Sequence, residues 1–558
     1  MESFRLALVQ INPTVGDLDG NIALIKNQLE RLQDCDLAVF GEMSVTGYPL
    51  EDLVLKPGFV ADNRAALQKI AEISGNCATV VGFVDSDDEN VYNAIAICHE
   101  GEIVGTYRKQ NLPNVEVFDE VRNFSSGNSS LNLFCIGGVS VGFAICEDLW
   151  APKGPIELLR KGGAELIVVS NGSPFHQGKQ EERETFVSEK AISHGLPIAY
   201  VNLVGGQDEL VFDGGSFISD PHGEIITSAP RFQEALVIAD LEIKKSKNDK
   251  NNLPIKEVSG SQNRSAIAKP FVSPQLGELE ELYMALVLST RDYVKKSGFN
   301  EVCLGLSGGI DSALVATIAA DALGAKSVHA VLMPSRYSSD HSITDAENLT
   351  TNLGISSLKF PIEDIHKTTS DQWGIYLDSQ MPGLADENLQ SRIRGVLLMA
   401  LSNAYNLLVL TTGNKSEAAV GYSTLYGDTA GAFAVIKDVY KTSVYELANW
   451  RNESTSKEII PSSIINKAPS AELRPEQRDD QSLPPYEILD PLLKAYIEGD
   501  RTRTELIQDG FDPGLVDGIV NSVDKSEYKR RQNPPGVRVT RKGFGRDRRL
   551  PIVNKYSG

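Results

Sequence analysis

The sequence predicts an α/β protein of two domains. Its 558 residues exceed what one hydrophobic core usually organises. Short β-rich runs alternate with amphipathic helical patterns in both halves, as is typical of α/β folds. Between the halves, segment 246–275 is rich in Lys, Asn, Ser and Pro and shows little periodicity. We therefore predict a first domain over 1–245, a linker over 246–275 and a second domain over 276–558. The alternative is that 246–275 forms a long surface loop within one domain.

The first half predicts a mixed β-sheet. Apolar residues at helical spacing begin near Asn21 and again near Asn63, which predicts two helices. Several β-rich runs follow one another across turn-prone residues without a helix between them, so pure βαβ winding is disfavoured. These runs are Leu6–Val9, Leu37–Phe40, Thr79–Val84, Val139–Ile145, Leu166–Ser170 and Ile198–Leu203.

The second half predicts a doubly wound parallel sheet. A helix over 277–296 opens it, and strand and helix then alternate regularly. The expected order is strand 301–306, helix 312–323, strand 327–332 and helix 340–353. From Pro469 the chain is rich in proline and charge, which predicts a tail dominated by loops.

Composition excludes several classes of protein. A net charge of −21 disfavours binding to nucleic acid or to an anionic membrane surface. The chain has no run of ~18 apolar residues and no signal segment, so we expect no membrane span and a cytoplasmic location. Its six cysteines are scattered without CxxC pairs, which predicts reduced thiols with neither disulfides nor a zinc site. A basic segment over 529–531 and 538–549 is interpreted as a solvated face, or alternatively as a site for a phosphate-rich substrate.

The clearest motif of the second half lies between a predicted strand and a predicted helix. Adjacent glycines let backbone N–H groups approach an oxyanion, and the helix N-terminus and two hydroxyls add donors. No Lys-Ser/Thr pair completes a Walker loop. An acid beside phosphate requires a bridging cation, so Asp311 predicts Mg²⁺. The alternative is a glycine-rich turn that binds nothing. The motif reads Gly305, Leu306, Ser307, Gly308, Gly309, Ile310, Asp311 and Ser312.

This motif resembles the signature of the N-type ATP pyrophosphatases, which cleave ATP between the α and β phosphates and adenylylate a carboxylate. Segments 407–428 and 438–442 resemble the NAD synthetase family in particular. The resemblance implies that the loop and Thr412 bind ATP, and that Asp311 and Glu417 surround Mg²⁺. It also implies that Asn388, Glu417 and Lys529 bind deamido-NAD⁺. The alternatives are a helix cap for Asn388 and a solvated side chain for Lys529.

Three reactive residues of the first half, Glu42, Lys109 and Cys146, each follow a β-rich run. A thiol on a tight turn after a strand can project its sulfur into a pocket. Because a free thiol has a pKa of about 8.5, it needs a base near neutral pH. The alternative for Cys146 is a small buried hydrophobic residue.

This ordered set resembles the nitrilase superfamily of carbon–nitrogen hydrolases over about residues 4 to 240, which implies an N-terminal αββα sandwich. By that resemblance Glu42 is the base, Lys109 stabilises the oxyanion and Cys146 forms a thioester. Glu120 would orient the lysine, with a surface acid as the alternative. In glutamine-using members, Ser173 and Lys179 match residues that contact the substrate.

Two positions depart from the family pattern. Val115 follows Leu-Pro-Asn where a tyrosine is common, and Asn123 replaces another usual tyrosine. A glutamine contact made by the first tyrosine would be lost or supplied by main chain. His176 is interpreted as a structural or surface histidine.

Together the two resemblances imply a ligase that couples a nitrilase-like glutaminase to an ATP pyrophosphatase domain. Deamido-NAD⁺ would be adenylylated by ATP and attacked by ammonia from L-glutamine, giving NAD⁺, AMP, diphosphate and glutamate. Family members also imply a homo-oligomer formed through the second domain. The alternatives are another amidotransferase of this ATP pyrophosphatase type, such as a GMP synthetase, or a nitrilase-type amidase with a nucleotide-sensing domain.

Overall fold

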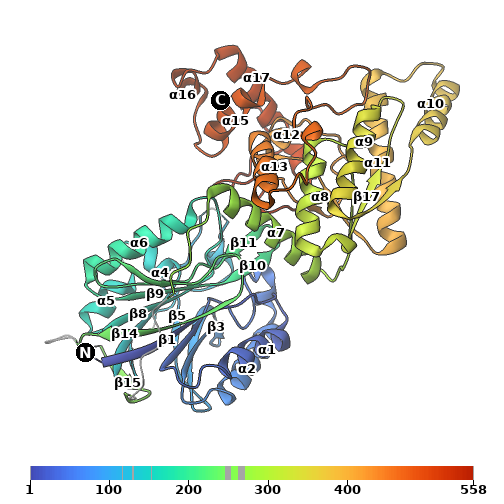
Figure 1. The fold of residues 1–558 in the computed structure, drawn as a ribbon. Helices are drawn as coiled ribbons and strands as arrows, with labels where there is room; N and C mark the ends of the chain where they lie inside the picture. The colour runs from blue at the N-terminus through green and yellow to red at the C-terminus, as the bar shows by residue number, and fades with distance from the viewer. Residues whose placement is uncertain are drawn as a thin grey trace. The chain divides into compact units, whose positions relative to one another are not determined.

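A computed structural model describes residues 2–115, 117–128, 131–152, 154–245, 253–261 and 271–556. The chain divides into two compact units (Figure 1). The first comprises Met1–Gln207 and Val211–Leu276, and the second comprises Asp208–Leu210 and Gly277–Gly558. None of the described helices is long and apolar enough to cross a membrane. No two of the six cysteines form a disulfide in the structure.

The first unit contains two mixed sheets. The order of the six-stranded sheet is β14-β1-β2-β3-β4-β5, with parallel pairing from β1 to β3 and antiparallel pairing elsewhere. The order of the seven-stranded sheet is β13-β12-β9-β8-β7-β6-β15, with β7, β8 and β9 parallel. The first sheet has β1 (Glu2–Gln10), β2 (Leu37–Phe40), β3 (Ala78–Ser86), β4 (Val91–His99), β5 (Glu102–Arg108) and β14 (Ala235–Ile243). The second has β6 (Leu133–Ile136), β7 (Val139–Ile145), β8 (Leu166–Asn171), β9 (Ile198–Asn202), β12 (Phe217–Ser219), β13 (Ile225–Ser228) and β15 (Ile255–Glu257).

The two sheets pack face to face. Alternate residues of β1 separate by face: Leu6 and Leu8 enter the core shared with the other sheet, whereas Ala7 and Val9 enter the core beneath the helices. Helices α1 (Leu18–Leu29) and α2 (Pro57–Glu72) cover the first sheet, and α5 (Pro155–Lys161) and α6 (Lys179–His194) cover the second (Figure 1). The predicted αββα sandwich is therefore confirmed.

Much of segment 246–275 lies outside the described residues, but its described parts are attached to the first unit. Strand β15 pairs in parallel with β6. Farther on, the carbonyl oxygen of Phe271 accepts a hydrogen bond from the Ser228 N–H at 3.0 Å. The attachment of β15 satisfies an edge of the seven-stranded sheet that would otherwise be unpaired.

The second unit contains a five-stranded parallel sheet of order β18-β17-β16-β19-β20, as predicted for a doubly wound fold. The strand order reverses between β16 and β19, and ligands of such sheets bind at the carboxyl ends of the strands beside this point. The strands are β16 (Val302–Gly305), β17 (Val328–Leu332), β18 (Ser356–Lys359), β19 (Leu408–Thr411) and β20 (Phe433–Ala434). The helices include α7 (Glu278–Lys296), α8 (Ile310–Leu323), α9 (Asp340–Leu353), α10 (Glu363–Leu377), α11 (Gly383–Tyr405), α12 (Lys415–Val420) and α13 (Lys441–Thr455).

Most described residues of the tail after Pro469 lie outside helices, as predicted, but the four helices within it were not predicted. Residues after Pro469 form α15 (Tyr486–Ile497), α16 (Arg503–Gln508), α17 (Pro513–Lys525) and α18 (Glu527–Arg530). Several prolines that suggested loops mark helix starts: Pro485 is the N-cap of α15, and Pro513 is the first residue of α17. Thr502 begins α16 with a capping box. Apolar side chains of these helices then pack into one core cluster.

Candidate active sites

The first unit brings three predicted residues together in its interior. The Lys109 ammonium donates to Glu42 Oε1 at 2.7 Å and to Glu120 Oε2 at 2.8 Å. Glu42 lies two residues after β2, Lys109 directly follows β5, and Glu120 begins the short helix α3 (Glu120–Asn123). All three side chains are at most 5 % exposed. Glu120 is thus a buried partner of the lysine and not a surface acid.

Cys146 lies between β7 and the short helix α4 (Glu147–Trp150). Its φ is 42°, a left-handed conformation that non-glycine residues adopt rarely and often at functional sites. Burial raises the pKa of the Cys146 thiol well above its usual value, the charge of Glu42 raises it further, and the charge of Lys109 opposes both. A thiol whose pKa is raised is deprotonated less readily and needs a nearby base to react as a nucleophile.

Two further residues hold the glutamates in place. The Asn93 amide on β4 donates to Glu42 Oε1 at 2.6 Å and to Glu120 Oε1 at 3.1 Å. The Tyr48 hydroxyl donates to Glu120 Oε1 at 2.9 Å. Sequence reasoning missed both residues. Asn93 had a recognisable signal, because it is a polar residue at a fully buried position within an apolar strand.

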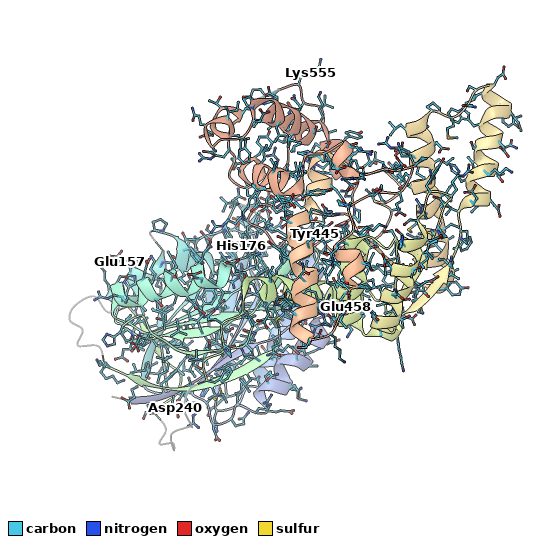
Figure 2. All side chains as sticks on the ribbon, turned by 45° about the horizontal axis from the view of Figure 1, so that its top comes forward. Glu157, His176, Asp240, Tyr445, Glu458 and Lys555 are labelled. Carbon is cyan, nitrogen blue, oxygen red and sulfur yellow. The ribbon has the colours of Figure 1, made fainter. Side chains whose placement is uncertain are left out.

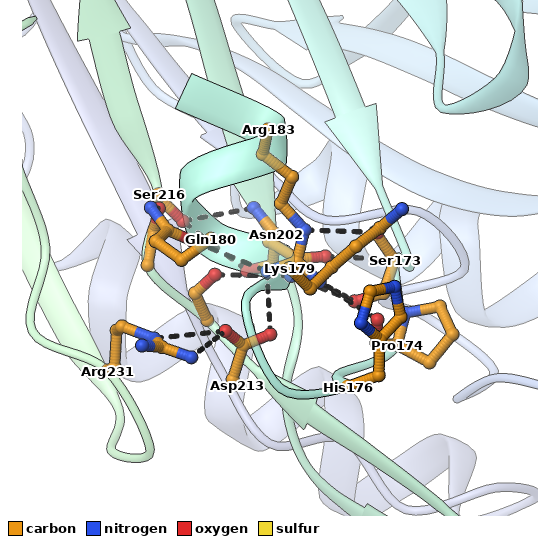
Figure 3. Close-up of polar contacts among 12 residues, drawn as sticks. Ser173, Pro174, His176, Lys179, Gln180, Arg183, Asn202, Asp213, Ser216 and Arg231 are labelled. Carbon is orange, nitrogen blue, oxygen red and sulfur yellow. Dashed lines mark hydrogen bonds and ion pairs between the residues drawn. The ribbon is translucent and has the colours of Figure 1, made fainter. Parts of the chain in front are cut away.

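The predicted glutamine-binding residues lie on the loop from β8 to α6 and on the first turn of α6 (Figure 3). Lys179 Nζ lies 3.3 Å from Glu182 Oε2 and 4.9 Å from the centroid of the Trp150 ring. The Ser173 hydroxyl accepts a hydrogen bond from Arg183 Nε at 3.2 Å. His176 is buried on the same loop, as expected for a structural histidine.

A buried arginine fixes the main chain of this loop (Figure 3). Arg183 on α6 is fully buried and donates to the carbonyl oxygens of Ser173 at 2.8 Å and Pro174 at 3.0 Å. Its charge is balanced by Asp213, whose carboxylate lies 2.7 Å from Arg183 Nη1 and 2.9 Å from Arg231 Nη2. Sequence reasoning missed this network. Its signal was an arginine on the buried face of a helix, three residues after Gln180 and four before Val187.

Val115 and Asn123, the two positions that depart from the family pattern, take part in none of the hydrogen bonds described above. Val115 is 66 % exposed, and Asn123 is the last residue of α3.

In the second unit, the predicted phosphate loop connects β16 to α8. Gly308 has φ of 78°, and a Cβ there would lie 2.2 Å from the carbonyl oxygen of Ser342, so only glycine fits. The hydroxyls of Ser307 and Ser312 lie 3.1 Å apart, and Ser307 Oγ accepts from the Gly309 N–H at 3.2 Å. These contacts preform a tight turn at the N-terminus of α8.

A cavity of about 300 Å³ lies at the carboxyl ends of these strands. All predicted ATP-binding residues except Gly308 line it, as does Glu417. Tyr445 on α13, labelled in Figure 2, also contributes to its wall. Arg394 on α11 borders the cavity as a further cation, and its guanidinium donates to the carbonyl oxygen of Met333 at 3.0 Å.

Two carboxylates share one cation in this cavity. Lys441 Nζ pairs with Asp311 Oδ2 and lies 3.4 Å from Glu417 Oε1. Burial raises the pKa of Glu417 to about 8, with contributions from the charges of Asp311 and Asp479 and opposition from Lys441. Lys441 was not predicted as a site residue, although it belongs to the recognised segment 438–442.

The carboxylate pair fits Mg²⁺. Within the described ranges, no three His, Cys, Asp or Glu side chains converge as a metal cage. Asp311 and Glu417 nevertheless contact one cationic group in common, the Lys441 ammonium, so their oxygens face a shared position suited to a cation. Mg²⁺ is typically held by one or two protein carboxylates together with substrate phosphates.

The remaining predicted residues, Asn388 and Lys529, contact the turn after α12 instead of lining the cavity. Asn388 Oδ1 accepts from the Thr424 hydroxyl at 2.8 Å. Lys529 Nζ donates to the carbonyl oxygens of Gly421 and Ser423, each at 2.7 Å. Burial lowers the pKa of Lys529. Other members of the basic segment pair with acids of the same unit: Arg531 with Glu527, Arg538 with Asp547, Lys542 with Asp500 and Arg548 with Asp524.

Comparison with known proteins identifies both units. A family model described as carbon-nitrogen hydrolase matches residues 5–250, and one described as NAD synthase matches residues 282–533. The glutamine-dependent NAD(+) synthetase of Thermotoga maritima is 46 % identical and covers 100 % of this chain and 99 % of its own length. The enzyme of the same name from Acinetobacter baylyi is 43 % identical, with the same coverage.

Solved structures agree along the whole length. The glutamine-dependent NAD⁺ synthetase of Acinetobacter baumannii, solved in complex with ADP, is 40 % identical, covers 99 % of each chain and has a TM-score of 0.75. A synthetase from Cytophaga hutchinsonii has a TM-score of 0.84 at 20 % identity, with 99 % of this chain and 98 % of its own covered, and shows the likeness of fold alone.

Proposed function

The chain belongs to the glutamine-dependent NAD(+) synthetases, and we propose how its residues divide that reaction between the two units. It is a ligase that amidates deamido-NAD⁺ with ammonia from L-glutamine and consumes ATP. The first unit releases the ammonia, and the second forms and amidates the adenylylated carboxylate. The observation that carries this division is the buried cluster of Glu42, Lys109 and Glu120 beside a thiol that needs a base.

In the first unit, Glu42 takes the proton of Cys146 as the sulfur attacks the amide carbon of glutamine. Lys109 stabilises the oxyanion that forms, and Glu120, itself held by Asn93, keeps its ammonium in place. Glu42 returns the proton to the leaving nitrogen, so ammonia departs and a thioester remains. Water, deprotonated by Glu42, then releases glutamate and the free thiol.

Glutamine is recognised through its backbone groups. Lys179 is positioned by Trp150 and Glu182 to pair with the α-carboxylate. Ser173 is fixed by Arg183 and accepts a hydrogen bond from the α-ammonium. The buried arginine thereby sets the geometry of the substrate loop.

In the second unit, the backbone N–H groups of the loop from Gly305 to Ser312 bind the pyrophosphate part of ATP, aided by the helix dipole. Thr412 contacts the nucleotide. Asp311 and Glu417 hold Mg²⁺, which when bound neutralises the charge of the leaving diphosphate. Lys441 can move its ammonium from these carboxylates to a phosphate oxygen.

The dinucleotide is bound beside the turn that follows α12. Asn388 and Lys529 both hold this turn, and Tyr422 and Thr424 within it line the cavity. Lys529 uses two of its three ammonium protons on main-chain carbonyls, so one remains for a substrate oxygen. Together with Glu417, these residues form the deamido-NAD⁺ subsite. Neither a different amide acceptor nor a nucleotide-sensing role is favoured, because the relatives share one activity along the full chain.

We further propose that a second copy of the chain covers an apolar surface on α10 and α11. Large apolar side chains are exposed along these two helices, and clustered exposed apolar side chains mark interaction surfaces. They are Ile375, Tyr376, Leu377, Leu384, Val396, Met399 and Tyr405. Light scattering should give the mass of an oligomer, and Val396→Glu should reduce it. A monomeric wild-type chain at micromolar concentration would contradict this assignment.

The division of labour is tested with Cys146→Ala. Glutamine-driven NAD⁺ formation should be abolished, whereas ammonium-driven formation should persist, because ammonium bypasses the thiol. Cys135, a free thiol of the same unit, provides the matched control as Cys135→Ala. Equal loss with both nitrogen sources would count against separable sites, and retained glutamine use would remove Cys146 from the role of nucleophile.

A further inference from the structure

The nucleophile and the catalytic lysine come from different sheets. Lys109 follows β5 of the six-stranded sheet, and Cys146 follows β7 of the seven-stranded sheet. Strands β5 and β7 do not pair, so the β-ladders do not set the position of the ammonium relative to the thiol. A fully buried carboxylate, that of Asp148, joins the two segments by hydrogen bonds.

Asp148 accepts five hydrogen bonds. Its Oδ2 accepts from the Tyr107 hydroxyl at 2.7 Å and from the Ile145 N–H at 3.1 Å. Its Oδ1 accepts from the N–H groups of Gln110 at 3.2 Å and Asn111 at 2.9 Å, and from the Asn111 side-chain amide at 2.9 Å. A carboxylate has about four lone-pair sites, so its capacity is fully used.

These donors flank both catalytic residues. Tyr107, Gln110 and Asn111 lie on either side of Lys109, and Ile145 directly precedes Cys146. The bond from Ile145 also closes the turn in which Cys146 takes its left-handed conformation. Asp148 therefore determines the shape of the nucleophile turn and attaches the lysine segment to it.

We propose that Asp148 is the positioning residue of the glutaminase reaction: its carboxylate fixes segment 107–111 against the Cys146 turn and so places the Lys109 ammonium where the oxyanion forms. This inference rests on the proposed roles of Lys109 and Cys146. A neutral amide cannot replace the carboxylate, because its NH₂ group would face donors on one side. An unmade hydrogen bond at a buried position is costly, and a displacement of about 1 Å in a catalytic geometry can cost ~10²-fold in rate.

The test is Asp148→Asn, measured with both nitrogen sources. We expect kcat for glutamine to fall about 10²-fold with KM changed less than about threefold, because the substrate loop is untouched. Ammonium-driven synthesis should stay at the wild-type rate, which reports that the second unit is intact. Asn111→Asp in the Asp148→Asn background replaces the side-chain NH₂ that donates to Oδ1 by an acceptor for the new amide. It should restore kcat about tenfold, a gain that loss of stability alone would not produce.

If Asp148→Asn does not yield folded protein, Tyr107→Phe and Asn111→Ala carry the test, since each removes one donor and keeps the carboxylate. Each should lower kcat for glutamine several-fold at unchanged KM, in line with about 1 kcal/mol per hydrogen bond. Wild-type kcat in Asp148→Asn, or in both of these variants, would overturn the inference. So would strictly additive effects of Asn111→Asp and Asp148→Asn. Cys146→Ala distinguishes failure of this inference from failure of the proposed function, because glutamine use in that variant would refute the nucleophile assignment itself.

Discussion

Asp311→Asn tests the charge arrangement of the ATP cavity without changing its shape. Asp311 Oδ1 accepts from the Asn414 amide at 2.9 Å, and an asparagine oxygen can keep that bond. Its Oδ2 pairs with Lys441, and there a neutral NH₂ group would replace the charge. Of the two carboxylates at the shared cation position, only Glu417 would remain.

The expected magnitude follows from removal of one preorganised charge. Such a loss costs about 2.7–4 kcal/mol of transition-state stabilisation, or 10²–10³ in kcat. The loss should be equal with glutamine and with ammonium, because adenylylation precedes the use of either. Hydrolysis of glutamine by the first unit should survive, since the substitution lies in the other unit.

The assay is NAD⁺ formation at saturating ATP and Mg²⁺ with each nitrogen source. Asp321→Asn is the matched control: Asp321 lies on the same helix, α8, outside the cavity lining, and pairs with Arg451 at 2.7 Å. Because Asp321 also accepts from the Tyr283 hydroxyl, the control should lose about 1–3 kcal/mol of folding free energy but no activity. Near-normal turnover of Asp311→Asn at saturating Mg²⁺ would refute the assignment of the loop.

Further predictions concern the dinucleotide subsite and the thiol. Lys529→Ala should raise the KM for deamido-NAD⁺ by about tenfold to a hundredfold, the equivalent of 1.5–3 kcal/mol, with a much smaller effect on ATP. Steady-state kinetics check this, and equal weakening of both substrates would assign the lysine to ATP. In iodoacetamide alkylation of Cys146 against pH, Glu42→Gln should shift the midpoint to lower pH, because the charge of Glu42 raises the pKa of the thiol. Lys109→Met should shift it to higher pH, because the lysine charge lowers that pKa, and midpoints that do not move would place the thiol away from both groups.

The sequence alone predicted the two-unit α/β fold and several of the residues that the structure brings together in each unit. Both follow from local patterns: β-rich runs and helical spacing are readable within a few residues, and a reactive side chain just after a strand lies at the end of the sheet, where ligand sites are commonly formed. Glu42, Lys109 and Cys146 each occupy such a position. The phosphate loop was readable because its glycines, hydroxyls and acid are contiguous.

In the tail, local patterns did not reveal the four helices that the structure contains. Its prolines and charges indicated loops, yet Pro513 is the first residue of α17. Proline lacks a backbone N–H, so it interrupts the interior of a helix but is well suited to its first turn. Whether a proline marks the end or the start of a helix therefore depends on whether an amphipathic segment follows it. In this tail, the apolar face of that segment is completed by packing among several helices.

Only the tertiary structure decided which polar residues support the reactive ones. Tyr48 contacts Glu120 across 72 positions, and Lys441 contacts Asp311 across 130. In the sequence these residues are indistinguishable from solvated ones, because hydrogen bonds and ion pairs between distant segments leave no periodic trace. Burial makes the difference: once water is excluded, each polar group requires a specific partner. The fold brings particular strand ends together and thereby determines which partner each buried polar group has.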